Sequence, residues 1–145
     1  MNDLSILDHN RVILCHFDSY STALVFARYD TGVLAPAPLP ASASAMPAPG
    51  DANGRYTPDA VLDALVAQYG LDPSPLKLDA GFQAWMSSDR GPICIHLARF
   101  TTFEAPSQAI ESLGGVFKPI SAMRGLPVVQ LNLLRQVFNL IMSGG

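Results

Sequence analysis

PICIHLARFTTF, residues 92–103, is the stretch that decides the fold, because it is an apolar run of one strand's length, interrupted only by a histidine and an arginine. It follows GFQAWMSS (81–88) and a short DRG segment, in which Gly91 suits a left-handed turn position. These two stretches are therefore predicted to form a β-hairpin.

A second hairpin is predicted near the N-terminus. RVILCHFD (11–18) and STALVFARYD (21–30) are rich in β-branched and aromatic residues, and turn-forming residues join them. The tract that follows, residues 34–54, consists largely of alanine and proline. Prolines favour extended polyproline II backbone, so this tract is predicted to be a semi-rigid linker or arm. The alternative is a disordered surface loop, because long structureless segments are usually linkers or disordered.

Three helices are expected in the rest of the chain. The first begins at Thr57, whose hydroxyl can cap the helix, continues through Pro58 and ends at Gly70. A short helix is predicted over residues 106–113 and a long one over residues 128–142.

The order of elements is therefore ββ, linker, α, ββ, α, α. Two hairpins separated by a helix indicate one antiparallel sheet packed against helices, which is a two-layer α+β sandwich. The chain of 145 residues has the length of one domain, so we expect residues 1–145 to fold as a single unit.

Charge is scarce in this chain. Charged residues make up 14% of the sequence, against about 25% in an average soluble domain. With so few charges, part of the surface has to be apolar or neutral, and such surface usually contacts another copy or another protein. We therefore expect a homo-oligomer or a protein partner.

Several other function classes are disfavoured. The net charge is −3 and the basic residues are scattered singly, which argues against nucleic-acid binding. The N-terminus has an acidic residue where a signal peptide needs positive charge, and no apolar run approaches the roughly 20 residues of a membrane span. A cytoplasmic protein that does not insert into a membrane is therefore expected.

The polar residues of the 92–103 strand are candidate ligand-binding groups. Side chains alternate along a strand, so His96 and Arg99 are predicted to point to opposite faces and to act separately. Either could anchor a small ligand, with Trp85 and Arg124 as further contacts. The alternative is that they are ordinary structural residues with hydrogen-bonded or solvated polar groups.

Cysteine and histidine also raise the question of a metal site. Cys94 and His96 lie two residues apart on one strand face, and Cys15 could supply a third ligand. The alternative is that these cysteines pack as small hydrophobic residues in a reducing compartment. The second reading is preferred, and no cofactor is predicted.

The last helix, residues 128–142, is apolar around most of its circumference. Its polar residues fall in one narrow sector, and they are Asn132, Arg135, Gln136 and Asn139. It is either a central core helix or a helix that packs on its own sheet with one side and on a partner with another. The candidate interface residues are Val129, Leu133 and Leu140.

Two functions remain open at this stage. The sequence contains no nucleophile elbow, phosphate loop or dinucleotide-binding turn, and no catalytic residue is assigned. The first hypothesis is a non-catalytic interaction or accessory subunit that associates through apolar surface, including the last helix. The second is a small-molecule-binding protein or enzyme whose pocket is anchored by His96 or Arg99.

Overall fold

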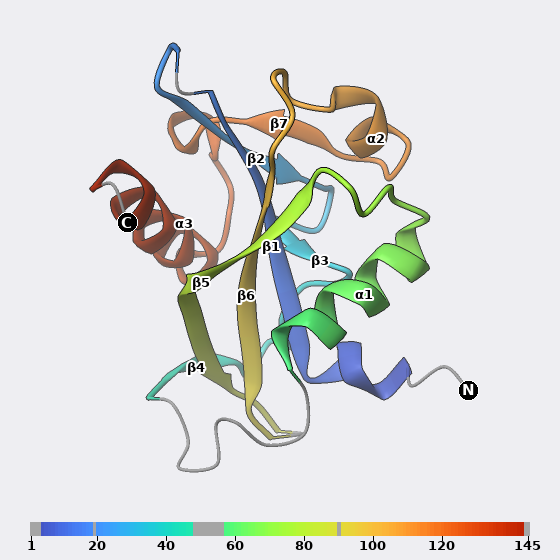
Figure 1. Cartoon of the computed structure of the whole chain (residues 1–145). Coiled ribbons are helices and arrows are strands. Elements are labelled where there is room, and N and C mark those ends of the chain that lie inside the picture. The colour runs from blue at the N-terminus through green and yellow to red at the C-terminus, as the bar shows by residue number, and fades with distance from the viewer. Residues whose placement is uncertain (1–3, 19, 48–56, 90, 144–145) are drawn as a thin grey trace.

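The computed structural model describes residues 4–18, 20–47, 57–89 and 91–143 (Figure 1). Within these residues the chain has an α+β fold with a mixed sheet. The strands are β1 (Asn10–Asp18), β2 (Ala23–Arg28), β3 (Leu34–Ala35), β4 (Ser44–Met46), β5 (Leu76–Ser87), β6 (Ile93–Phe100) and β7 (Val116–Lys118). The helices are α1 (Pro58–Tyr69), α2 (Ser107–Glu111) and α3 (Val128–Met142), with 3₁₀ turns η1 (Leu4–Asp8) and η2 (Ile120–Ala122).

The sheet is built around β1 and β6. Its strand order is β4-β5-β6-β1-β2-β7, and β3 pairs with β1 beside β2. β1 pairs antiparallel with β2, and β5 pairs antiparallel with β6. β1 and β6 run parallel, however, so the expectation of a wholly antiparallel sheet is wrong. Both strands are apolar at successive positions, which is typical of parallel strands covered on both faces.

Helices cover both faces of the sheet, rather than the single face expected of a two-layer sandwich. On one face, odd-numbered residues such as Ile13 and Ile95 pack against α3. On the other face, even-numbered residues such as Val12 and Ala98 pack against α1, α2 and η1. Figure 1 shows the sheet standing between α1 and α3. The physical reason is that β1 and β6 present apolar side chains in both directions, and each set needs cover.

The first long helix begins and ends where its sequence signals predict. Thr57 accepts a hydrogen bond from the Ala60 backbone N–H at 3.2 Å, and Pro58 occupies the first turn. Gly70 has a φ of 68° and donates its backbone N–H to the Val66 carbonyl. Local capping chemistry is therefore sufficient to set both ends of α1.

The long C-terminal helix α3 spans the predicted residues 128–142. Its inner side places Leu133, Leu134 and Val137 in the core, and its polar sector faces solvent. Among the described residues, no helix combines the length and apolarity needed to cross a bilayer.

The alanine- and proline-rich tract takes part in the sheet over its described portion, residues 34–47. β3 pairs with β1, and β4 pairs with β5 at the edge of the sheet. The guanidinium of Arg11 holds the intervening backbone, donating to the Ala37 carbonyl at 2.9 Å and to the Pro38 carbonyl at 3.3 Å. The rest of the predicted linker, residues 48–54, lies outside the described residues.

Candidate functional site

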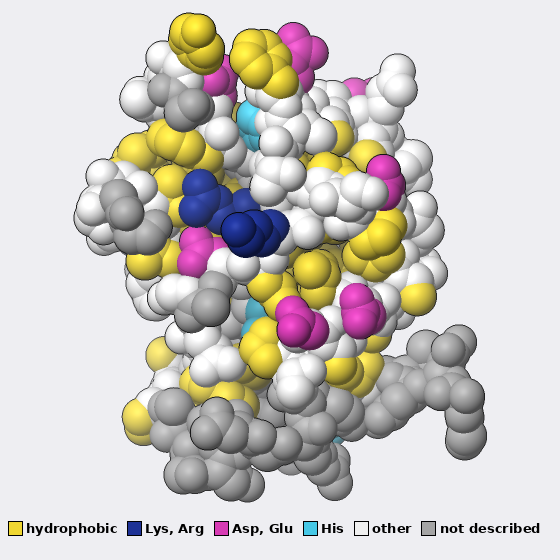
Figure 2. Space-filling view, viewed as in Figure 1, with side chains coloured by type: hydrophobic (Ala, Val, Ile, Leu, Met, Phe, Trp, Pro, Cys, Tyr) yellow, Lys and Arg dark blue, Asp and Glu magenta, His cyan; other side chains and the backbone are white. Residues whose placement is uncertain are grey.

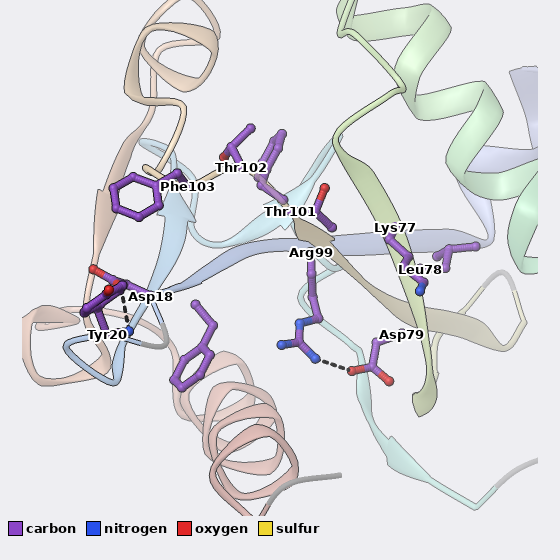
Figure 3. Close-up of a pocket in the computed structure, with 11 residues that line it drawn as sticks. Asp18, Tyr20, Lys77, Leu78, Asp79, Arg99, Thr101, Thr102 and Phe103 are labelled. Carbon is purple, nitrogen blue, oxygen red and sulfur yellow. Dashed lines mark hydrogen bonds and ion pairs between the residues drawn. The ribbon is translucent and has the colours of Figure 1, made fainter.

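A pocket of about 730 Å³ opens where the parallel strands β1 and β6 end (Figure 3). Its lining comes from the end of β1 and the turn after it, the start of β5, and the end of β6 with the segment after it. These residues are Phe17, Asp18, Tyr20, Lys77, Leu78, Asp79, Arg99, Phe100, Thr101, Thr102 and Phe103. The volume falls in the range of about 300–1,000 Å³ that is usual for small-molecule sites.

Two cations lie side by side in this pocket. Lys77 and Arg99 are direct cross-strand partners in the β5–β6 pair, so their side chains leave the same face of the sheet. Like charges at directly opposed positions destabilise a sheet. This arrangement is therefore costly unless an anion lies close to both.

Asp79 supplies one such anion. Its Oδ2 lies 3.3 Å from Nη1 of Arg99, and its Oδ1 accepts a hydrogen bond from the Gly81 backbone N–H at 2.9 Å. Both carboxylate oxygens are thus bonded: Oδ1 to the Gly81 backbone and Oδ2 to the Arg99 guanidinium.

A bulge in β5 accompanies this contact. From Leu78 to Gln83 the chain takes five steps, while the partner strand takes two, from Ala98 to His96. β5 visibly changes direction along its length (Figure 1). Bulges commonly redirect side chains next to binding sites, and this one follows directly on Lys77 and Asp79.

Much of the positive charge remains available to a ligand. The only hydrogen bond recorded for the Arg99 side chain, within the described residues, is the one to Asp79. Its other terminal nitrogen points away from Asp79, to the side of the pocket where Asp18 and Tyr20 lie (Figure 3). Lys77 is exposed and makes no ion pair with any residue that the structure describes. Figure 2 shows a patch of positive side chains on this side of the molecule, bordered by hydrophobic side chains.

Two aromatic side chains stand at the mouth of the pocket. Tyr20 is 89% exposed and Phe103 is 80% exposed, and their ring centroids lie 6.4 Å apart in an edge-to-face arrangement. They come from the turn after β1 and the segment after β6, so the fold brings together residues more than 80 positions apart.

His96 lies on the opposite face from Arg99, as strand alternation predicts, and does not line this pocket. It is buried, and its Nε2 donates to Oδ1 of Asn10 at 2.9 Å, since an amide oxygen can only accept. Asn10 in turn donates to the Ile6 carbonyl. Burial lowers the pKa of His96 to about 4, so the ring is neutral at pH 7.

The predicted three-ligand metal set is not assembled. Cys94 and His96 face the α1 side of the sheet, whereas Cys15 packs on the α3 side. No group of three or more His, Cys, Asp or Glu side chains suited to a metal occurs among the residues described. Burial raises the pKa of both thiols to about 12, so they pack as small apolar groups and are poor nucleophiles at pH 7.

The other predicted ligand contacts also lie elsewhere. Trp85 pairs with Cys94 and Met46 toward the far end of β5. Its indole N–H is buried and has no hydrogen-bond partner among the residues that the structure describes. Arg124 is exposed in the loop before α3, where its carbonyl accepts a hydrogen bond from Arg28 at 2.9 Å. Of the four predicted ligand-binding residues, the pocket contains only Arg99.

The predicted interface residues lie on or beside the inner side of α3. Leu133 is completely buried against the sheet, so it does not lie on an outer face of α3. Val129 and Leu140 are half-buried and pack against the same core. The helix has one inner side, set by the sheet, and the three residues lie on it or along its borders.

Sequence reasoning missed Lys77, Asp79, Tyr20 and Phe103. The first two fall between the expected helix end at Gly70 and the strand expected over residues 81–88, whereas β5 already begins at Leu76. The alternation in KLD, residues 77–79, was the available signal, because it places a cation and a carboxylate on one strand face.

Comparison with protein-family models found no match for this chain, and a search among curated proteins found none either.

Proposed function

We propose that the chain, folded as a single domain, binds a small molecule that carries an anionic group, in the pocket at the ends of β1 and β6. The observation that carries this proposal is the direct opposition of Lys77 and Arg99 on one sheet face, where Asp79 pairs with Arg99 alone among the described residues. A bound anion would relieve the repulsion between the two cations.

The chemistry of the two cations favours an oxyanion. A guanidinium binds carboxylate or phosphate with two parallel hydrogen bonds, and Arg99 has used one terminal nitrogen on Asp79. The exposed ammonium of Lys77 adds a mobile point charge next to it. Because Arg99 is only 32% exposed, its charge is less screened than that of a fully solvated side chain.

Binding rather than catalysis is the activity we infer. The described lining residues include hydroxyl, carboxylate and cationic groups but no imidazole or thiol. The hydroxyl of Thr101 donates to the Pro75 carbonyl and that of Thr102 to the Glu104 carbonyl, so neither has a base as its partner. We place this activity in the cytoplasm, where the two unbridged cysteines stay reduced.

The experiment that tests the proposal is a heteronuclear NMR titration with sodium acetate, referenced to the same concentration of sodium chloride. Acetate is expected to shift the amide signals of the pocket residues. Arg99→Gln and Lys77→Gln should each weaken acetate binding about 5- to 10-fold, in line with the loss of one charge-assisted hydrogen bond. Asp79→Asn should strengthen binding, because Arg99 loses its competing carboxylate.

Arg135→Gln is the matched control, since Arg135 is an exposed arginine on α3 that contacts Asn132 and lies outside the pocket. It should bind acetate as the unchanged protein does. Acetate shifts spread over the whole surface, or equal binding by the Arg99→Gln variant, would contradict the proposal.

A second candidate function, association with another protein or a second copy, is favoured by one observation. The outer side of α3 carries Val128, Phe138 and Met142, which are 69%, 36% and 38% exposed. These residues fall within a narrow arc of the helix, which is the spacing of a helix–helix contact. Self-association through this side would account for the low charge content of the chain.

A further inference from the structure

The exposed aromatic pair at the pocket mouth calls for a physical explanation. Tyr20 and Phe103 are the two most exposed large hydrophobic side chains among the described residues. Each keeps an apolar ring in water, and their mutual contact covers only part of it. Aromatic side chains placed in this way are typical of ligand and protein contacts, where they bury area with little loss of side-chain entropy.

The backbone on the Tyr20 side is held in place by its own turn. The carboxylate of Asp18 accepts hydrogen bonds from the Tyr20 N–H at 2.9 Å and from the Ser21 hydroxyl at 3.0 Å. Thr22 has a φ of 54°, an unusual conformation for a β-branched residue. Such local strain persists only where the surrounding structure enforces it, and it is found preferentially near binding sites.

The backbone on the Phe103 side is held as well. Nε2 of His16 donates to the Thr102 carbonyl at 2.8 Å, and the Thr102 hydroxyl donates to the Glu104 carbonyl at 2.6 Å. These bonds fix the residues on both sides of Phe103. The two rings are thus presented from supported backbone on either side of the opening.

The charge inside the pocket distinguishes between kinds of anion. The lining holds two cations, Lys77 and Arg99, and two carboxylates, Asp18 and Asp79. Their formal charges cancel, so a phosphate dianion would leave the site strongly negative, whereas a carboxylate adds a single negative charge. Phe17, which packs against the core, adds an apolar surface to the same lining.

These observations converge on one ligand class. We propose that the pocket binds an aromatic monocarboxylate, whose carboxylate is held by Lys77 and Arg99 and whose ring stacks on Tyr20 and Phe103. This inference rests on the proposed function, because it names the class of anion that the pocket accepts. It adds to that function a requirement for an aromatic ring and a preference for a single negative charge.

The test compares four probes in the same NMR titration. These are phenylacetate, acetate, phenylethanol as a ring without charge, and phenyl phosphate as a ring with a dianion. Phenylacetate is expected to bind about 10-fold more tightly than acetate or phenylethanol, since stacking and ring burial add to the charge contact. Phenyl phosphate should bind more weakly than phenylacetate, because the two lining carboxylates oppose its second charge.

Variants test whether the aromatic pair contacts the ring of the ligand and whether Arg99 contacts its carboxylate. The double variant Tyr20→Ser with Phe103→Ser should bind phenylacetate no better than acetate. Arg99→Gln should reduce phenylacetate to the affinity of phenylethanol. Phe138→Ser, which removes an exposed ring on α3 outside the pocket, is the matched control and should change neither affinity.

Each other outcome overturns the inference, and the results separate it from the proposed function. Equal binding of acetate and phenylacetate at the pocket would refute the aromatic requirement and leave anion binding standing. Tighter binding of phenyl phosphate would refute the monocarboxylate class alone. Binding of phenylethanol as tight as that of phenylacetate, or no binding of any charged probe, would refute both.

Discussion

Asp79 shows how a single side chain builds the pocket. One of its oxygens caps the Gly81 backbone in the β5 bulge, and the other holds the Arg99 guanidinium at 3.3 Å. The carboxylate is 13% exposed, so its contact with Arg99 is stronger than an ordinary surface ion pair. The same contact orients Arg99 so that part of its guanidinium is left for a ligand.

His96 predicts how stability depends on pH. Its pKa falls from 6.5 in the unfolded chain to about 4 in the fold, because burial disfavours the charged ring. Between these values the unfolded chain binds more protons than the folded one. The contribution of neutral His96 to the free energy of unfolding is therefore fully present above pH 6.5. It is lost as the pH falls toward 4, which lowers the free energy of unfolding by about 3 kcal/mol in total.

Urea unfolding at a series of pH values checks this expectation. The window from pH 6.5 to 5 is the informative one, since most carboxylates titrate below it. His96→Gln should be less stable at pH 7, but its free energy of unfolding should no longer change with pH in this window. His9→Gln should keep the pH dependence of the unchanged protein. An unchanged slope in His96→Gln would show that another group is responsible.

At the scale of elements, α3 has two sides with different roles. Leu133, Leu134 and Val137 form part of the core, while Phe138 and Met142 remain exposed. Gln130 ties the helix to the β2–β3 connection, because its buried side chain accepts a hydrogen bond from the Val33 backbone N–H at 2.9 Å. This bond fixes the rotation of the helix about its axis. Its outer stripe, the exposed residues Val128, Phe138 and Met142, therefore faces solvent in one direction.

Substitutions on the two sides of α3 should separate folding from association. Leu133→Ala is expected to lower the free energy of unfolding by about 3 kcal/mol, because it leaves a cavity in the core. Phe138→Ala should change it by less than about 1 kcal/mol. Urea unfolding measures both values.

If the outer stripe is an interface, Phe138→Ala should shift the protein toward monomer in size-exclusion chromatography with light scattering. A multimer of unchanged mass in Phe138→Ala would contradict a role for this stripe in association. A monomeric unchanged protein would exclude self-association and leave a different partner protein as the occupant.

At the scale of the whole molecule, the sheet is a central layer that η1, α3 and the described part of the proline-rich tract help to cover. Arg11 connects three of these parts. Its guanidinium donates to the carbonyls of Leu7 at 2.6 Å and Ala37 at 2.9 Å, while its own backbone lies in β1. Burial lowers the pKa of Arg11, and the carbonyl contacts offset this cost of desolvation.

Removal of this connection should loosen the proline-rich tract. Arg11→Met is expected to lower the free energy of unfolding by about 3 kcal/mol, because it leaves several carbonyls without a donor. It should also speed thermolysin cleavage within residues 37–47. Arg11→Lys retains the charge but not the planar guanidinium. Its stability and cleavage rate should lie between those of Arg11→Met and the unchanged protein. Cleavage at the unchanged rate in Arg11→Met would show that β4 alone holds the tract.

Features that depend on neighbours a few residues apart could be predicted. The cap at Thr57, the stop at Gly70 and the span of α3 follow from contacts within one or two helical turns. The opposite orientation of His96 and Arg99 follows from strand alternation alone. None of these predictions required knowledge of which strands lie side by side.

Features that depend on distant segments could not be predicted in the same way. The parallel pairing of β1 with β6 places Cys15 beside Arg99. Cys94 lies five residues before Arg99 on β6, and its side chain points to the opposite face of the sheet. In this register Cys15 lies on the other face of the sheet from Cys94 and His96, so the three predicted metal ligands do not come together. Likewise, Leu133 resembles an outer apolar residue until the sheet determines which side of the helix is buried.

The sequence by itself determined the α+β class, the ends of the long helices, and the alternation that separates His96 from Arg99. Only the tertiary structure decided that helices cover both faces, that Lys77 opposes Arg99, and that Tyr20 meets Phe103. The reason is that helix ends and strand alternation follow from local backbone geometry, whereas strand register and the meeting of loops follow from packing summed over the whole core.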